Sequence, residues 1–398
     1  MQRVRFGALA LAVCVSATGN PVALLAQQID SSTSRDVAPG VVHRRLVVNK
    51  GPWRINVLEV NLRQPGISIR AVRAGDRFFG REKVSSMVRR YKGPGRVAGA
   101  VNGDFFAIRG ASENENNVVI EGDLIKGVKT TDSPYDAFDT IHSQFAVDSS
   151  DHPLIERFAF AGKAIPPGQK TFSLDRLNSS PPGNGLVLYT PAFGDRSPTD
   201  SIGRHPLSLS LERIGRRRDT LIFRIAGGPV TGGKLALSSG GVLAAEGTSR
   251  ADLRQIARSG RMLGIVARLE PRGRALRTVI GGWPRLIVHG VSVADSADKL
   301  EGTFPRFSAE RHPRTAVGFS RDSTRLYLIT VDGRQESTSG MSLIELAKLM
   351  LDLGVYEGMN FDGGGSTTMV VDGKLVNSPS DKAGERLVGS GLMVVVEK

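Results

Sequence analysis

Most of this chain is a succession of short apolar segments separated by glycine and proline, and this pattern limits the fold more than any other feature. Apolar residues alternate with polar ones at positions 67–71, and compact apolar runs occupy positions 97–101, 186–189 and 221–225. Such runs are typical of β-strands, and the Pro- and Gly-rich sequences between them are typical of turns. The pattern therefore predicts a structure that is built mainly from strands.

Helical spacing is confined to a few places, at about 84–91, 249–258 and 342–353. In the last of these, Ser342 and Glu345 have the spacing of a capping box. Strands that occur in blocks with few helices between them indicate the α+β class rather than repeated βαβ units. We predict mixed, mostly antiparallel sheets with a few helices.

The first 26 residues have the features of a secretory signal peptide. Arg3 and Arg5 precede an uncharged apolar run at 6–17, which is shorter than the ~20 residues that a membrane-spanning helix needs. Small residues follow this run, as at a cleavage site. We predict a signal peptide over 1–26, a flexible lead-in over 27–44 and export to the periplasm or the cell exterior, and we expect no membrane span.

The balance of charge points to an anionic partner. The chain has 53 Lys and Arg residues against 39 Asp and Glu residues, and such an excess of positive charge attracts anions. It has one cysteine, which excludes a framework of disulfide bonds. Aromatic residues make up only 6% of the chain, and no motif of a nucleic-acid-binding protein is present. We expect no nucleic acid as partner, and anionic glycans, phosphodiester polymers and headgroups remain as candidates. The sequence does not determine the oligomeric state.

The strongest local motif is NFDGGGSTT at residues 360–368. Three consecutive glycines let a ligand or another strand approach the main chain closely, and their N–H groups can form an anion-binding nest. Asp362 follows an expected strand, where a catalytic carboxylate would be firmly held. The alternative is a tight connection between strands, with Asp362 only capping the turn.

A second motif, NGDFF at residues 102–106, also follows an expected strand. It places an amide, Asn102, and a carboxylate, Asp104, beside two aromatic residues. Phe105 and Phe106 are expected mainly in the core, although one of them could stack on a sugar. Asp104 alone is more often a turn residue than a catalyst.

Basic residues at the two ends of a predicted hairpin form a third group. Arg314 precedes the strand at 315–319, and Arg334 follows the strand at 326–331 with Asp332 beside it. Two arginines at one sheet edge can hold a phosphate by bidentate hydrogen bonds; the alternative is a surface ion pair. His312 is expected in a loop.

The remaining polar groups narrow the chemistry. Asp381 and Arg386 lie in a polar segment that can fold back over the glycine motif. No Ser nucleophile elbow is evident, and the histidines have no metal-type spacing. Carboxylates, arginines and a glycine nest favour hydrolysis at a sugar or phosphate centre over acyl transfer.

These motifs, together with GWPRL at 282–286, PRTAVG at 313–318 and NSPSD at 377–381, resemble the phosphodiester glycosidase family, which includes N-acetylglucosamine-1-phosphodiester α-N-acetylglucosaminidase. The likeness spans about residues 50–398 and is densest after Arg314. It implies a catalytic domain over 45–398, with a variable region at about 110–280. It also implies a hydrolase that cleaves the anomeric C–O bond of a sugar 1-phosphodiester in an envelope or extracellular glycan.

The resemblance also implies roles for individual residues. Asp362 or Asp332 would act at the anomeric centre, with Asp104, where the family often has a small residue, as a third and less secure candidate. The groups expected to bind substrate are amides, arginines, the glycine nest, hydroxyls and a carboxylate: Asn102, Arg314, Arg334, Asn360, Gly363, Gly364, Gly365, Ser366, Thr367, Asp381 and Arg386. Retaining and inverting mechanisms both remain open.

Two other functions remain as alternatives. The first is a non-catalytic binder of polysaccharide on the same fold. The second is a phosphodiesterase that breaks the P–O bond, for which a two-metal cluster would be expected. No cofactor is predicted with certainty, and a divalent cation held by carboxylates and loop carbonyls remains an open alternative.

Overall fold

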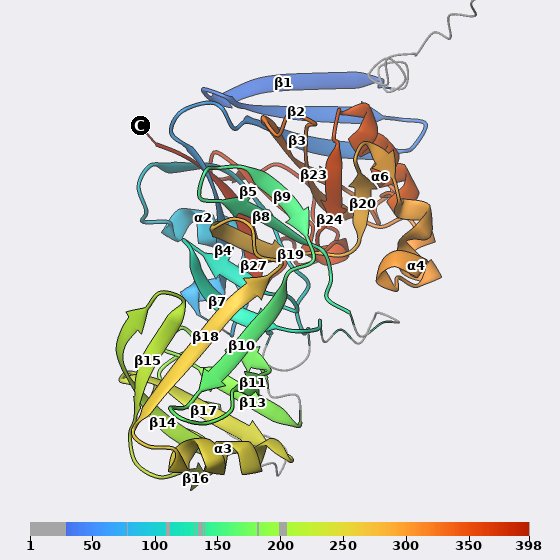
Figure 1. Ribbon diagram of the computed structural model, residues 1–398. Helices are drawn as coiled ribbons and strands as arrows, with labels where there is room; N and C mark the ends of the chain where they lie inside the picture. Colours follow the sequence, from blue (N-terminus) through green and yellow to red (C-terminus); the bar gives the residue numbers. More distant parts are fainter. Residues whose placement is uncertain are drawn as a thin grey trace, which may run out of the picture.

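The computed structural model describes residues 29–77, 79–108, 112–131, 133, 138, 140–180, 183–198 and 205–397. The predicted signal peptide, 1–26, lies outside these residues. The described chain folds into three sheets with a few short helices (Figure 1). The predicted α+β class with mostly antiparallel pairing is therefore confirmed. Among the described helices, none is long and apolar enough to cross a membrane.

The first sheet has eight strands, which come from residues 31–61 and 285–360. In spatial order they are β1 (Ser31–Ala38), β2 (Val41–Val48), β3 (Trp53–Asn61), β23 (Arg325–Val331), β22 (Arg314–Phe319), β24 (Glu357–Asn360), β20 (Arg285–Val288) and β21 (Val291–Ser292). β22 and β23 form the predicted hairpin, with Arg314 opposite Val331.

The prediction of a flexible lead-in over 27–44 is wrong from Ser31 onward. β1 pairs with β2 along its whole length, and β2 pairs with β3 from Val41 to Val48. Nearly all of β1 is exposed, so its polar side chains leave no apolar periodicity. Main-chain hydrogen bonds to β2 hold it at the edge of the sheet.

The second sheet has fourteen strands, most of which form a separate lobe in the lower part of Figure 1. Its strands, in spatial order, are β11 (Phe172–Leu174), β10 (Ala159–Ile165), β18 (Met262–Glu270), β15 (Thr220–Ile225), β14 (Leu207–Arg217), β17 (Gly240–Glu246), β13 (Gly185–Tyr189), β12 (Arg176–Leu177), β7 (Asp123–Val128), β6 (Val118–Ile120), β19 (Leu276–Gly281), β8 (Gln144–Asp148) and β9 (Pro153–Glu156), with β16 (Val230–Thr231) beside β14. Helix α3 (Ser249–Arg258) packs Leu253 and Ile256 into the core of this lobe.

The third sheet has five strands and lies beside the first. They are β26 (Lys374–Leu375), β25 (Met369–Val371), β5 (Arg96–Asn102), β27 (Ser390–Val396) and β4 (Ile67–Arg73). Helix α2 (Val84–Arg90) covers its outer face. Within the part of the chain that the structure describes, the short helical turns are η1 (Ala74–Asp76), η2 (Ala294–Ser296) and η3 (Gly364–Ser366).

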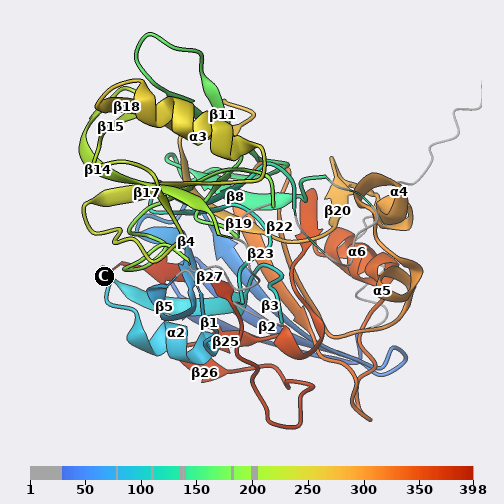
Figure 2. The same cartoon turned by 90° about the horizontal axis from the view of Figure 1, so that it is seen from below.

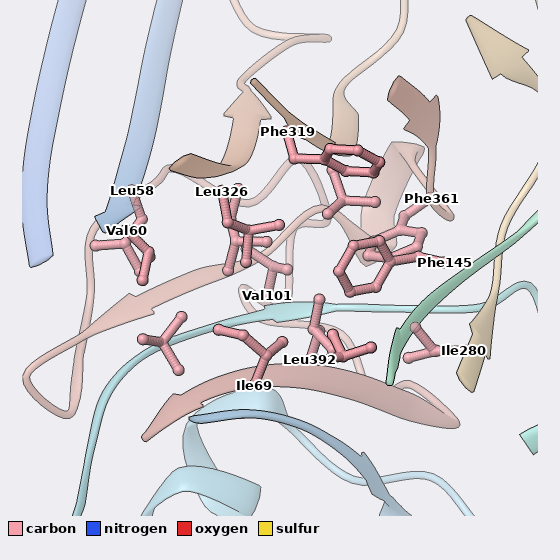
Figure 3. Packing of buried hydrophobic residues seen from close by; sticks show 14 of the residues in the cluster. Leu58, Val60, Ile69, Val101, Phe145, Ile280, Phe319, Leu326, Phe361 and Leu392 are labelled. Atoms are coloured by element: carbon pink, nitrogen blue, oxygen red, sulfur yellow. The ribbon is translucent and has the colours of Figure 1, made fainter. Parts of the chain in front are cut away.

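The main hydrophobic core lies between the first and third sheets. Leu58 of β3 and Leu326 of β23 face Val101 of β5 and Leu392 of β27 across it (Figure 3). Their burial removes apolar surface from water at roughly 25 cal/mol per Å². The two sheets are thereby fixed against each other, which matters because the candidate site takes residues from both.

Helix α6 (Leu343–Asp352) covers the other face of the first sheet, with α4 (Ala297–Glu301) and α5 (Pro305–Ala309) beside it (Figure 2). The predicted capping box is confirmed, because the Ser342 hydroxyl accepts from the Glu345 N–H and the Glu345 carboxylate accepts from the Ser342 N–H.

Candidate active site

An open cleft of about 530 Å³ lies where β22 begins and β24 ends. Antiparallel pairing of these strands brings Asn360 opposite Ala316, so the glycine motif that follows Asn360 passes the start of β22. Seven of the predicted site residues line the cleft: Arg314, Arg334, Asp362, Gly363, Gly364, Gly365 and Arg386. Segments that are far apart in the sequence thus meet at one opening.

Asp362 is held in the cleft by its main chain. Its N–H donates to Gly103 O at 3.0 Å, and its carbonyl oxygen accepts from Asn102 Nδ2 at 2.6 Å. Enclosure by the protein disfavours the charged form and raises the pKa of Asp362 to about 7, although Ser366 and the charge of Arg386 oppose this shift. The carboxyl group can therefore exchange a proton near neutral pH.

Side chains pack closely against the glycines. Gly364 has φ of +60°, and a Cβ there would lie 3.2 Å from Arg334 Nη1. A Cβ at Gly365 would overlap the Arg386 guanidinium and the Asp381 carboxylate. The motif thus lets the two arginine side chains lie directly on the main chain.

Arg314 is almost fully buried at the base of the cleft. Nε donates to Met341 O at 2.9 Å, and Nη2 donates to Phe307 O at 2.6 Å and Glu310 O at 3.1 Å. Burial, together with the positive charge of Arg334, lowers the pKa of Arg314 to about 9. Because these bonds use Nε and Nη2, Nη1 is the nitrogen available to a ligand.

Arg334 and Arg386 are positioned by different partners. Arg334 Nη2 donates to His312 Nδ1 at 3.2 Å, while Arg386 forms a bidentate pair with Asp381 at 2.7 and 2.9 Å. Within the described residues, neither Arg314 nor Arg334 forms an ion pair. The cleft is therefore positive and suited to an anion.

Aromatic rings form another part of the lining, and Phe307 lies against Arg314, whose Cζ is 4.9 Å from the ring centroid. Trp283 stacks on Phe307 with centroids 4.8 Å apart, Phe105 meets Trp283 edge-on at 6.0 Å, and Phe304 is exposed at the rim. The sequence-based expectation placed Phe105 mainly in the core, whereas the structure has it line the cleft. Apolar rings beside cationic groups can bind the face of a sugar ring while its phosphate meets the arginines.

Glu115, which sequence reasoning missed, also lines the cleft. Burial, and then the negative charge of Asp104, raises the pKa of Glu115 to about 8, and Asp362 contributes to this shift. Its segment is anchored by the buried Lys126, which pairs with Glu113 at 2.7 Å and donates to Asn114 O. Glu115 precedes β6 in a loop with no periodicity, so the sequence carries no local signal for it.

Two of the three carboxylates predicted to be catalytic, Asp104 and Asp332, do not line the cleft. Asp104 is buried and accepts two hydrogen bonds from Asn116, at 2.8 and 2.9 Å. Asp332 is also buried and accepts from Ser378 N at 3.1 Å, and burial raises the pKa of Asp332 to about 6. The negative charge of Asp104 affects the cleft because it raises the pKa of Glu115. Asp332 connects its own loop to the loop of Ser378 by a hydrogen bond.

Four other predicted residues lie behind the glycine motif. Asn102 holds Asp362, and Asn360 Nδ2 donates to Trp283 O at 2.7 Å. The hydroxyls of Ser366 and Thr367 are buried, and within the described residues they have no hydrogen-bond partner of normal geometry. These residues position the site from behind and do not form its surface.

In the described part of the chain, no group of three or more His, Cys, Asp and Glu side chains is arranged to hold a metal ion.

The C-terminal region of the chain is similar to known proteins. Residues 220–395 match the phosphodiester glycosidase family model. N-acetylglucosamine-1-phosphodiester alpha-N-acetylglucosaminidase of Bos taurus is 44% identical over 80 residues, which are 20% of this chain and only 15% of the bovine protein.

Two solved structures share the fold over most of the chain. One from Synechocystis has a TM-score of 0.74 at 20% identity and covers 92% of this chain and 64% of its own. One from Burkholderia pseudomallei K96243 has a TM-score of 0.67 at 24% identity and covers 87% of this chain and 74% of its own. The match of residues 220–395 to the phosphodiester glycosidase family model agrees with the resemblance that the sequence motifs indicated.

Proposed function

We propose that the protein is an exported hydrolase that cleaves the anomeric C–O bond of a sugar 1-phosphodiester in an envelope or extracellular glycan. Water supplies the new hydroxyl at the anomeric carbon, and a phosphate monoester leaves with the bridging oxygen. The observation that carries this proposal is the convergence of Arg314, Arg334 and Arg386 with Asp362 in one aromatic-walled cleft.

The arginines bind the phosphodiester and stabilise the charge that develops on it as the C–O bond breaks. Arg334 pairs with no carboxylate within the described residues; its side-chain partner is His312 Nδ1 at 3.2 Å, and burial and the nearby charge of Arg314 lower the pKa of His312. Because a phosphate is a weakly basic leaving group, its departure needs little help from a general acid.

Asp362 acts at the anomeric carbon, as nucleophile or as base for water. It is the predicted carboxylate that reaches the cleft, whereas Asp332 points to Ser378. Its pKa of about 7 leaves a large share of the group ionised at neutral pH. We therefore favour Asp362 over Asp332 and Asp104 for this role.

Glu115 remains protonated at neutral pH, given its pKa of about 8. A neutral carboxyl group can donate a hydrogen bond to the substrate, and it places no second negative charge beside Asp362. Glu115 therefore preserves the attraction of the cleft for an anion.

The reaction is tested by incubating the purified protein with an α-N-acetylglucosamine 1-phosphodiester in ¹⁸O water. Label on the sugar is the expected result. Label on the phosphate would mean P–O cleavage and would overturn the proposal in favour of a phosphodiesterase. Absence of turnover across several sugar 1-phosphodiesters that nevertheless bind would favour a non-catalytic polysaccharide-binding protein.

A further inference from the structure

The lobe formed by residues 159–270 carries an excess of positive charge. It has 16 Lys and Arg against 8 Asp and Glu, whereas the whole chain has 53 against 39. The lobe is separate from the strands β22 and β24 that border the cleft (Figures 1 and 2). The chemistry proposed for the cleft therefore leaves this charge unexplained.

Strand register places part of this charge on one surface. Lys163 of β10 lies opposite Val266 of β18. Val266 in turn lies opposite Thr220 of β15, and Thr220 lies opposite Arg217 of β14. Alternate residues of a strand share a face, so Arg268, two positions after Val266, is on this same face.

This face is the outside of the lobe. The neighbouring residues of opposite parity, Phe223 and Ile265, are buried in its core together with α3. We name the surface that carries Lys163, Arg217 and Arg268 the outer face. At about 4.8 Å between strands, Lys163 and Arg217 are roughly 14 Å apart, which is wider than one phosphate group.

A hollow of about 410 Å³ lies on the outer face. Arg217, Arg218, Arg268 and Arg272 line it, with Asp219 as the carboxylate among them. Arg272 pairs with Asp219 at 2.8 Å, and Arg268 pairs with Glu270 at 2.8 Å.

The charge of the outer face is only partly compensated. Within the described residues, Lys163, Arg217 and Arg218 form no ion pair. The face therefore keeps a net positive charge, and its guanidinium groups can take phosphate oxygens in pairs.

We infer that the outer face binds a glycan chain with repeated phosphodiester links, so that the substrate class is a polyanionic polymer and not a small sugar phosphate. This inference rests on the proposed function, because both surfaces then bind one chemical repeat. A ligand that reaches from Lys163 to Arg217 needs charges at intervals, which a polymer provides. Ile165 and Met262, 37% and 38% exposed on the same face, offer apolar contact to sugar rings.

The composition of the face favours a glycan over a nucleic acid. Proteins that bind single-stranded nucleic acid stack bases on aromatic side chains, whereas the residues between Lys163 and Arg217 are Val266 and Thr220. A concave hollow lined by arginines also suits discrete phosphate groups better than a flat lipid surface.

The test compares a polymer of N-acetylglucosamine 1-phosphodiesters with the monomeric α-N-acetylglucosamine 1-phosphodiester. The test variant combines Lys163→Gln, Arg217→Gln and Arg268→Gln. The control variant combines Arg250→Gln, Arg254→Gln and Arg258→Gln, which removes the same charge from α3 in the same lobe. Each protein is assayed for kcat/KM on both substrates and for direct binding of the polymer at two salt concentrations.

The test variant is expected to bind the polymer roughly tenfold more weakly, since each exposed charge contact contributes a few-fold, and to lose a similar factor in kcat/KM on the polymer. Its kcat/KM on the monomer stays unchanged, and the control variant matches the unmodified protein on both substrates. Raising the salt concentration is expected to reduce the difference in polymer affinity between the test variant and the unmodified protein, because salt screens exposed charges.

Equal polymer binding by the two variants would overturn the inference. The inference would also be overturned if the unmodified protein bound anionic phospholipid vesicles or single-stranded DNA more strongly than the polymer, and if only the test variant lost that binding. The outer face would then bind a different partner. If the unmodified protein binds the polymer but does not hydrolyse the monomer, the proposed function is overturned. The inference that the outer face binds the polymer is then still judged by the binding measurement, which does not depend on turnover.

Discussion

The side-chain amide of Asn102 donates to the carbonyl oxygen of Asp362 at 2.6 Å. The Asn102 oxygen also accepts from the Thr315 hydroxyl at 2.8 Å and from the Thr368 N–H at 3.0 Å. One buried side chain at the end of β5 therefore joins the start of β22 to both sides of the glycine motif. The position of the proposed catalytic carboxylate depends on the packing of two sheets.

Asn102→Asp replaces the donor to Asp362 by an oxygen of nearly equal size. The new oxygen faces the carbonyl of Asp362, so we expect kcat to fall more than tenfold and the free energy of unfolding to fall by about 1–3 kcal/mol. Steady-state kinetics and urea unfolding measure the two effects, with the exposed Asn49→Asp as control. An unchanged kcat would show that this contact does not position the site.

Asp362→Asn and Asp332→Asn separate the two carboxylates that the sequence ranks together. Asp362→Asn is expected to lower kcat by at least a thousandfold, because the group at the anomeric centre is lost. Asp332→Asn keeps an oxygen acceptor for Ser378 N and should retain most of the turnover. The reverse ranking in a single-turnover assay would move the chemistry to Asp332.

The pH dependence of activity reports on Asp362 and Glu115. The pKa of about 7 for Asp362 predicts that kcat falls on the acid side, as its carboxylate is protonated. The pKa of about 8 for Glu115 predicts that KM rises above pH 8, because its new negative charge repels the phosphodiester. Glu115→Gln should abolish this rise and keep the acid limb; an identical alkaline limb in the variant would contradict the role of Glu115.

The same group links stability to pH. The pKa of Glu115 is about 8 in the folded protein against a usual value of 4.5, so between these values the folded state holds a proton that the unfolded state has released. Stability therefore falls as pH rises through this range. The Tm advantage of Glu115→Gln over the unmodified protein should grow between pH 5 and pH 8. Parallel Tm curves would mean that Glu115 titrates alike in both states.

Gly365→Ala tests the close packing over the glycine motif. The added Cβ would displace the ion pair of Arg386 and Asp381, so KM should rise about tenfold or more while kcat changes less, since losing one charged hydrogen bond costs about 1.5–3 kcal/mol. Gly273→Ala is the matched control, because nothing lies within 4 Å of its added carbon. Equal KM values in the two variants would show that the pair tolerates displacement.

Local sequence signals were sufficient for the parts of the site that are fixed by main-chain geometry. The glycine motif, the capping box of Ser342 and the hairpin that begins at Arg314 each have a spacing with one strong structural meaning. Side-chain direction has no such signal. Asp332 stands two residues from Arg334 in the sequence, yet its carboxylate accepts from Ser378 N while Arg334 lies on Gly364.

Long-range contacts account for what the sequence missed. Glu115 reaches the cleft because the buried Lys126 holds its loop, and the raised pKa of Glu115 comes from burial and from Asp104. The sequence predicts a flexible segment where β1 lies because an exposed edge strand shows no apolar alternation. In both places tertiary partners, and not local pattern, determine the structure.

The lobe of residues 159–270 enters and leaves the rest of the molecule through neighbouring strands, because Ala159 at the start of β10 pairs with Glu270 at the end of β18. The pairing of β12 with β7 also joins the lobe to the rest of its sheet, and a segment whose two ends are adjacent tolerates exchange when such a contact is kept. The fold thus allows the lobe to diverge as an evolutionary unit. A lineage could adapt to a new polymer there while it keeps the same chemistry at Asp362.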